Sequence, residues 1–229
     1  TVRIDRDDNI WAVDKGSDMI IKFNPAGRVV MVFGRRMEST HPNTKPHPHV
    51  NPPRPAVDGL FREPTDVAWD SVGNIYITDG YINSRIAKYD SHGNWLTTWG
   101  SFGSGGEHAN ENPGSINNPH NIQMDAQDNL YVGDRGNRRI QVFGTDGTFK
   151  KFIFMNVPYD KNRHPVLGNK NAAPPDETQP WTICITNGPT QYLFTSDSEP
   201  GRIYKMTLDG KILGTFGESG HDVGQFNWI

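Results

Sequence analysis

The chain repeats one pattern of short strands four times, and this repetition restricts the fold more than any other feature of the sequence. In each copy, a short run rich in apolar and aromatic residues ends in an aspartate, at positions 14, 79, 134 and 197. Successive aspartates are 65, 55 and 63 residues apart. The four runs are Asn9–Asp14, Asn74–Asp79, Asn129–Asp134 and Tyr192–Asp197. We interpret each run as the second strand of a repeating unit.

Each run is preceded by a first strand and followed by a third strand, a glycine-containing turn and a fourth strand. The turn glycines are Gly27, Gly93, Gly147 and Gly210. A four-stranded unit of about 40 residues is typical of a β-propeller blade. No copy shows the 3.6-residue period of a helix, which excludes helical repeats, and blades are stable only when they stack on one another.

We therefore predict an all-β chain that forms a single propeller domain over residues 1–229. The blades are expected at about 1–34, 64–100, 119–154 and 180–217, and 226–229 is expected to start a further blade. Propellers close with about 4–8 blades, and the repeat pattern continues to both ends of the chain, which predicts an incomplete ring. Two uncovered blade faces also predict self-association through the terminal blades.

The composition agrees with many short strands and excludes two kinds of partner. The apolar share is 34%, with 24 glycines and 17 prolines, which suits strands joined by turns. The net charge of −3, without a basic block, argues against nucleic acid, and no apolar run approaches the ~18 residues of a membrane helix. The single cysteine, Cys184, excludes an internal disulfide framework and is expected to be buried in an inner strand.

Strand alternation predicts that three candidate functional residues lie at one end of the blades. Because the chain reverses at every strand, turns between second and third strands lie at the same end as the connectors between blades. We call this the connector end. His120 begins an innermost strand there, and Tyr81 and Arg135 lie in second-to-third turns. Long loops on a rigid scaffold commonly carry function, so a site is expected at this end.

Several of these segments resemble a known family. The run Asp134–Phe143 is typical of the NHL repeat. The runs Glu63–Asp70, Asp79–Ile86 and Pro119–Ile122 resemble the peptidylglycine α-amidating lyases, also called peptidyl-α-hydroxyglycine lyases. The resemblance covers essentially the whole chain and is strongest between residues 63 and 144. It implies a six-bladed propeller, of which this chain supplies the second to fifth blades.

The resemblance also implies an activity and two metals. That family cleaves a peptidyl-α-hydroxyglycine to a peptide amide and glyoxylate, using a zinc held by three histidines and a structural calcium on the axis. By motif, His120 matches a zinc histidine, Tyr81 the catalytic tyrosine and Arg135 a substrate or active-site arginine. Val2 matches a residue whose backbone carbonyl contacts the calcium.

The family's other two zinc histidines are expected just before Thr1 and just after Ile229, so activity of the chain by itself is in doubt. Ile82 replaces a cysteine that pairs in the animal enzymes, which favours a disulfide-free bacterial relative. The family also favours a secreted or periplasmic location.

Each candidate residue has a structural alternative. A zinc needs three or four ligands, so His120 without others is a histidine hydrogen-bonded in the strand framework. Tyr81 is otherwise an aromatic that covers a turn, and Arg135 pairs with Asp134 or with a neighbouring blade. The histidines at 41, 47 and 49 lie in a proline-rich loop without a known metal spacing. Residues that recur in the blades, including Arg85, Arg139, Arg202 and the four aspartates, are expected to be structural.

Two functions from different classes remain open at this stage. The first is a zinc-dependent lyase that acts on a small-molecule or peptide substrate. The second is a non-catalytic NHL propeller that binds peptide or protein ligands on its loop-rich face. A calcium-dependent hydrolase of the lactonase type shares the architecture but needs acidic ligands on the axis, which the sequence does not indicate. The choice depends on the site, because a fold does not imply a function.

Overall fold

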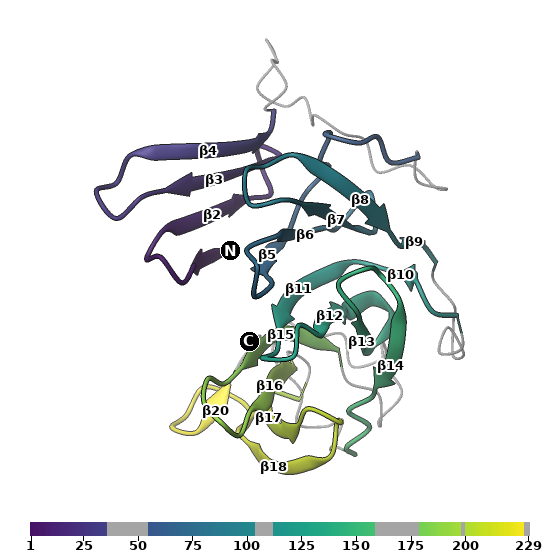
Figure 1. The fold of residues 1–229 in the computed structure, drawn as a ribbon. Helices are drawn as coiled ribbons and strands as arrows, with labels where there is room; N and C mark the ends of the chain where they lie inside the picture. The colour runs from purple at the N-terminus through teal and green to yellow at the C-terminus, as the bar shows by residue number, and fades with distance from the viewer. Residues whose placement is uncertain (36–54, 104–111, 159–178, 198–199, 227–229) are drawn as a thin grey trace, which may run out of the picture.

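The computed structural model describes residues 1–35, 55–103, 112–158, 179–197 and 200–226. Four four-stranded antiparallel sheets follow one another around an arc, and within each sheet every strand pairs with its neighbours in the chain (Figure 1). The first strands gather in the middle of the arc, and the fourth strands lie at its outside. This arrangement confirms the predicted all-β propeller architecture with four blades.

The blades contain the following strands. The first has β1 (Val2–Ile4), β2 (Ile10–Asp14), β3 (Met19–Phe23) and β4 (Val29–Gly34), and the second has β5 (Asp66–Trp69), β6 (Ile75–Asp79), β7 (Arg85–Tyr89) and β8 (Trp95–Trp99). The third has β11 (Pro119–Met124), β12 (Leu130–Asp134), β13 (Arg139–Phe143) and β14 (Phe149–Ile153), and the fourth has β15 (Pro180–Ile185), β16 (Tyr192–Asp197), β17 (Arg202–Thr207) and β18 (Ile212–Phe216).

Short elements lie between the blades and after the last one. β9 (Ser101–Phe102) pairs with β10 (Ser115–Ile116), β19 (Glu218–Ser219) pairs with β20 (Gln225–Phe226), and one 3-10 turn, η2, spans Arg135–Asn137. Residues 227–229, in the predicted start of a further blade, lie outside the described residues. Among the described residues, no helix has the length and apolar character that crossing a membrane requires.

The hydrophobic core consists of clusters between neighbouring blades. Alternate residues of a strand point to opposite faces of its sheet, so each inner blade contributes to two clusters. Trp11 and Phe33 of the first blade pack with Ile77 of the second, and Tyr131 of the third packs with Leu193 of the fourth. Burying each such large apolar side chain contributes about 1.5–3 kcal/mol, which is why the blades depend on one another.

The turns between first and second strands use one hydrogen-bond network in three blades. We call the end where they lie the turn end. Its aspartates are Asp5, Asp70 and Asp125, and each accepts from the backbone amide of the asparagine four residues later, at 3.0, 2.8 and 2.8 Å. Each also binds an aromatic side chain six residues later: Trp11 Nε1 at 2.8 Å, Tyr76 Oη at 2.9 Å and Tyr131 Oη at 3.3 Å.

In each of two blades, a buried aspartate–arginine pair stabilises the connector end. Arg85 Nε donates to Asp79 Oδ2, and Arg139 Nε donates to Asp134 Oδ2, each at 2.9 Å with both side chains at most 2% exposed. The same aspartates accept a connector amide, from Arg62 at 2.8 Å and from Asn117 at 2.7 Å. The prediction that these recurrent residues are structural is therefore confirmed for both pairs.

One burial prediction was wrong. Cys184 lies on the innermost strand β15, but it is exposed. Its neighbours Ile183 and Ile185 face the third blade and are buried there. Because side chains alternate along a strand, Cys184 points to the opposite face of the sheet.

Candidate functional site

Three of the predicted site residues meet at the connector end. Tyr81 lies in the turn between β6 and β7, His120 near the start of β11, and Arg135 in η2. The rings of Tyr81 and His120 have centroids 6.1 Å apart. Arg135 Nη1 donates a hydrogen bond of 3.3 Å to Tyr81 Oη. Residues separated by up to 54 positions in the chain therefore contact one another across two blades.

Two further residues complete this cluster, and the sequence analysis did not identify them. Lys15 Nζ lies 3.6 Å from the ring centroid of Tyr81. The ring of Trp181 lies 4.9 Å from that of His120, and the Arg135 guanidinium lies 3.7 Å from the Trp181 ring centroid. The cluster of Lys15, Tyr81, His120, Arg135 and Trp181 thus receives side chains from all four blades.

The repeat contained signals for both missed residues. Lys15 directly follows the aspartate that ends β2, as Arg135 directly follows the aspartate that ends β12. Trp181 follows the proline that begins β15, as His120 follows the proline that begins β11. Equivalent positions in different blades lie at the same end of the propeller. Aligning the copies by position, regardless of residue type, could therefore have found both.

A local irregularity at the start of two inner strands sets the direction of these side chains. On β11 the register shifts between Pro119 and Ile122, and on β15 it shifts between Pro180 and Thr182. Proline donates no backbone hydrogen bond and is confined to strand starts, edges and bulges. Such bulges often redirect a side chain near a functional site, and here they flank His120 and Trp181.

The hydrogen bonds of His120 define its tautomer. Nδ1 lies 2.7 Å from the backbone carbonyl oxygen of Trp181, which can only accept a hydrogen bond. Nδ1 therefore carries the proton, and Nε2 keeps a free lone pair. Burial lowers the pKa of His120, and the positive charge of Arg135 acts in the same direction. The ring is thus held neutral, with Nε2 in the form that binds metals.

Arg135 contacts residues of both neighbouring blades, which its structural alternative also allowed. Asp134 accepts from Arg139, from the side-chain amide of Asn137 and from the amide of Asn117. The Arg135 side chain stacks on Trp181 of the fourth blade and donates to Tyr81 of the second blade. Arginine combines such stacking with a planar fork of donors that suits a carboxylate. The role of Arg135 as a substrate or active-site arginine remains a prediction.

Val2, the predicted calcium contact, lies on β1, a strand that carries none of the cluster residues. Val2 is exposed on β1, where it pairs with Ala12, and its role remains a prediction. Its neighbour Arg3 donates to the buried carboxylate of Asp66 on β5 at 2.8 Å. That carboxylate also accepts from the Ile122 amide at 3.1 Å, so it links the inner strands of three blades.

Within the described ranges, no group of three or more His, Cys, Asp or Glu side chains is arranged to hold a metal ion. The histidines at 41, 47 and 49 fall outside those ranges.

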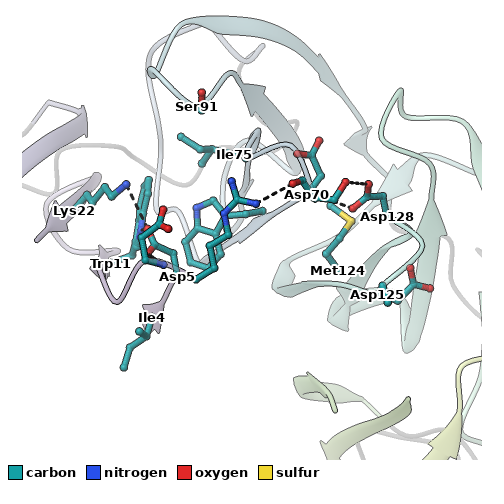
Figure 2. A pocket seen from close by; sticks show the side chains of 16 residues that line it. Ile4, Asp5, Trp11, Lys22, Asp70, Ile75, Ser91, Met124, Asp125 and Asp128 are labelled. Carbon is teal, nitrogen blue, oxygen red and sulfur yellow. Dashed lines mark hydrogen bonds and ion pairs between the residues drawn. The ribbon is translucent and has the colours of Figure 1, made fainter. Parts of the chain in front are cut away.

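A cavity of about 420 Å³ lies at the turn end of the first three blades (Figure 2). Its lining includes Trp11, Lys22, Asp70, Met124 and Asp128. Much of its polar lining belongs to the repeated turns, including all three aspartates of the turn network. None of the five residues of the connector-end cluster lines it. The hollow in Figure 2 and the predicted functional residues are therefore at opposite ends of the blades.

Comparison with known proteins adds sequence relatives to this geometry. The chain is 33% identical over 214 residues to peptidyl-glycine alpha-amidating monooxygenase A of Xenopus laevis, which covers 92% of the chain and 19% of that protein. It is 27% identical over 240 residues to a probable peptidyl-alpha-hydroxyglycine alpha-amidating lyase of Caenorhabditis elegans. This match covers 90% of the chain and 62% of that protein. It is 31% identical over 144 residues to NHL repeat-containing protein 3 of Mus musculus. This match covers 60% of the chain and 36% of that protein. The chain is an NHL-repeat β-propeller that resembles the amidating lyases. No family model matches it.

Solved structures agree on the fold of this NHL propeller. Virginiamycin B lyase from Staphylococcus aureus matches with a TM-score of 0.55 at 14% identity, covering 93% of the chain and 53% of that protein. A streptogramin B lyase structure matches with a TM-score of 0.53 at 16% identity, and the match covers 94% of the chain and 53% of that protein. At such low identity the likeness concerns the fold alone. The chain spans about half of these propellers and 19% of the Xenopus monooxygenase.

Proposed function

We propose that the protein carrying this chain is a zinc-dependent carbon–nitrogen lyase of the peptidyl-α-hydroxyglycine lyase type. It would convert a peptidyl-α-hydroxyglycine to a peptide amide and glyoxylate. The observation that carries the proposal is the meeting of Tyr81, His120 and Arg135 in one cluster. The similarity of the chain to a probable lyase over 90% of its length supports the same reaction.

The chemistry of His120 fits a zinc ligand. Its Nδ1 proton is held by the Trp181 carbonyl, which is the arrangement that leaves Nε2 for a metal and fixes the ring orientation. A catalytic zinc takes three protein ligands and a water or substrate, so His120 supplies one ligand and the family resemblance assigns two histidines outside residues 1–229. Bound zinc supplies Lewis acidity toward the substrate hydroxyl. A calcium at the Val2 carbonyl belongs to the same proposal.

The other residues of the cluster handle the substrate. Arg135 orients the carboxylate of the hydroxyglycine by a charge-assisted contact, and its stacking on Trp181 fixes the plane of the guanidinium. Tyr81 Oη, which the same guanidinium holds, takes the proton of the substrate hydroxyl. As that oxygen becomes the aldehyde oxygen of glyoxylate, the carbon–nitrogen bond breaks, and Tyr81 returns the proton to the nitrogen to complete the peptide amide.

The test uses the full-length protein, with zinc content and glyoxylate release from N-acetyl-α-hydroxyglycine as readouts. We expect stoichiometric zinc and glyoxylate in the wild type, and loss of both in His120→Ala. His92→Ala, in an exposed turn of the second blade, is the matched control and should retain both. Undiminished zinc in His120→Ala would contradict its role as a ligand. Absence of glyoxylate, with peptide binding that depends on the connector end, would favour a non-catalytic NHL propeller.

A further inference from the structure

The cluster contains a second cation in addition to Arg135. Lys15 occupies the first position after the aspartate that ends β2, and Arg135 occupies the same position after β12. Lys15 Nζ lies over the ring face of Tyr81 at 3.6 Å from the centroid, while Arg135 donates to the phenol oxygen. Tyr81 is therefore flanked by a lysine of the first blade and an arginine of the third.

The contacts of Lys15 differ from those of the structural cations. Arg85 and Arg139 are at most 2% exposed and bind buried aspartates. The Lys15 side chain is 49% exposed, and its anionic neighbour is Glu63, with Nζ 3.4 Å from Oε2. The pair is exposed on the lysine side, and its distance is longer than the 2.9 Å of the two buried pairs. The ammonium has three donors, so Lys15 can bind a ligand without leaving the Tyr81 ring.

We propose that Lys15 binds the carboxylate of the substrate together with Arg135, across the ring of Tyr81. The inference rests on the proposed function and adds a second carboxylate-binding residue to its site. Arginine supplies a planar fork and lysine a point charge, so the two cations can hold one carboxylate from two sides. A neutral carboxamide in the same place forfeits both charge interactions, and an internal glycine of a peptide has no carboxylate to offer.

The binding test separates recognition from chemistry by using an unreactive ligand. N-acetylglycine has the carboxylate but lacks the hydroxyl, and N-acetylglycinamide is its neutral match. We expect the full-length protein to prefer N-acetylglycine in NMR or calorimetric titrations. Lys15→Met should reduce this preference about fivefold to tenfold, as expected for a charge-assisted contact that solvent partly screens. Lys15→Arg should keep most of it, and Glu63→Gln should strengthen it by removing the competing carboxylate.

Lys205→Met is the matched control, because Lys205 Nζ also lies over a tyrosine, 4.1 Å from the Tyr192 centroid in the fourth blade. This variant loses the same charge and the same type of contact outside the cluster, and it should bind both ligands as the wild type does. An equal preference for the carboxylate in wild type and Lys15→Met would overturn the proposal. A loss of preference in Lys205→Met equal to that in Lys15→Met would also overturn it.

Kinetics distinguish failure of this inference from failure of the proposed function. For glyoxylate release, Lys15→Met should raise KM with a smaller change in kcat, as for a contact made equally in the bound substrate and the transition state. Glyoxylate release with an unchanged KM in Lys15→Met would leave the lyase standing and reject the role of Lys15. A wild type that makes no glyoxylate but prefers the carboxylate through Lys15 would reject the lyase and keep the binding site.

Discussion

The two ends of the blades differ in how closely their turns repeat. At the turn end, Asp5, Asp70 and Asp125 make the same contacts with an asparagine and an aromatic residue in three blades. At the connector end, the equivalent turns carry Lys15 in the first blade, Tyr81 in the second and Arg135 in the third. A contact repeated in three blades holds the turn that contains it, whereas side chains that differ between blades have no such shared structural task.

The cavity also distinguishes the two ends of the blades. The cavity of about 420 Å³ lies at the turn end. Its lining includes the turn aspartates, which accept hydrogen bonds from backbone amides of their own turns. The chemically diverse residues gather at the other end, outside that hollow.

Asp134→Ala should have the largest effect, although Asp134 directly precedes a residue of the cluster. It removes the partner of the fully buried Arg139, which typically costs about 3–5 kcal/mol. Urea unfolding of the full-length protein measures the loss. Asp146→Ala, in an exposed turn of the same blade, should cost less than about 1 kcal/mol. Similar losses in both variants would show that recurrence does not identify structural residues.

Tyr81→Phe should reduce kcat for glyoxylate release about 100-fold, or about 2.7 kcal/mol in the activation free energy. The change removes the oxygen that Arg135 holds and leaves the ring under Lys15 in place. Unfolding by urea should remain close to that of the wild type. A variant with normal kcat would exclude Tyr81 as the residue that moves the proton.

Tyr76→Phe is the converse change, made at the turn end. It removes a buried hydrogen bond of 2.9 Å to Asp70, which should cost about 1 kcal/mol of stability. Asp70 keeps its bond to the side-chain amide of Asn74 at 2.8 Å, so the turn should persist. Glyoxylate release should not change. A large fall in kcat would contradict the division of roles between the two ends.

The smallest expected effect is a change in how stability depends on pH when Asp5 of the turn network is replaced. Burial alone would raise the pKa of Asp5, but hydrogen bonds from Trp11 and Asn9 together bring it below its ordinary value. A lowered carboxyl pKa in the folded state stabilises the fold above the unfolded value of about 3.9, and this contribution is lost as pH falls through the folded pKa. Asp5→Asn should weaken the pH dependence of urea unfolding below about pH 4. The same acid dependence in wild type and variant would rule out this contribution.

The sequence predicted the fold well because strand alternation and turn chemistry are local. The second strands end at Asp14, Asp79, Asp134 and Asp197, the positions the repeat indicated. The same reasoning placed Tyr81, His120 and Arg135 at one end of the blades. It was wrong for Cys184, because a sheet has two faces and the repeat does not say which of them a neighbouring blade covers.

By itself, the sequence determined the strand order, the blade pattern and the end at which the candidate residues lie, since these follow from the backbone period of two and the reversal at each turn. The tertiary structure decided which side chains meet. Lys15 joins Tyr81, and Trp181 joins His120 and Arg135, through contacts between different blades. Such contacts depend on how blades stack and on bulges that turn individual side chains. The repeat can place Lys15 and Trp181 at the same end as the other three residues, but it does not show that their side chains touch.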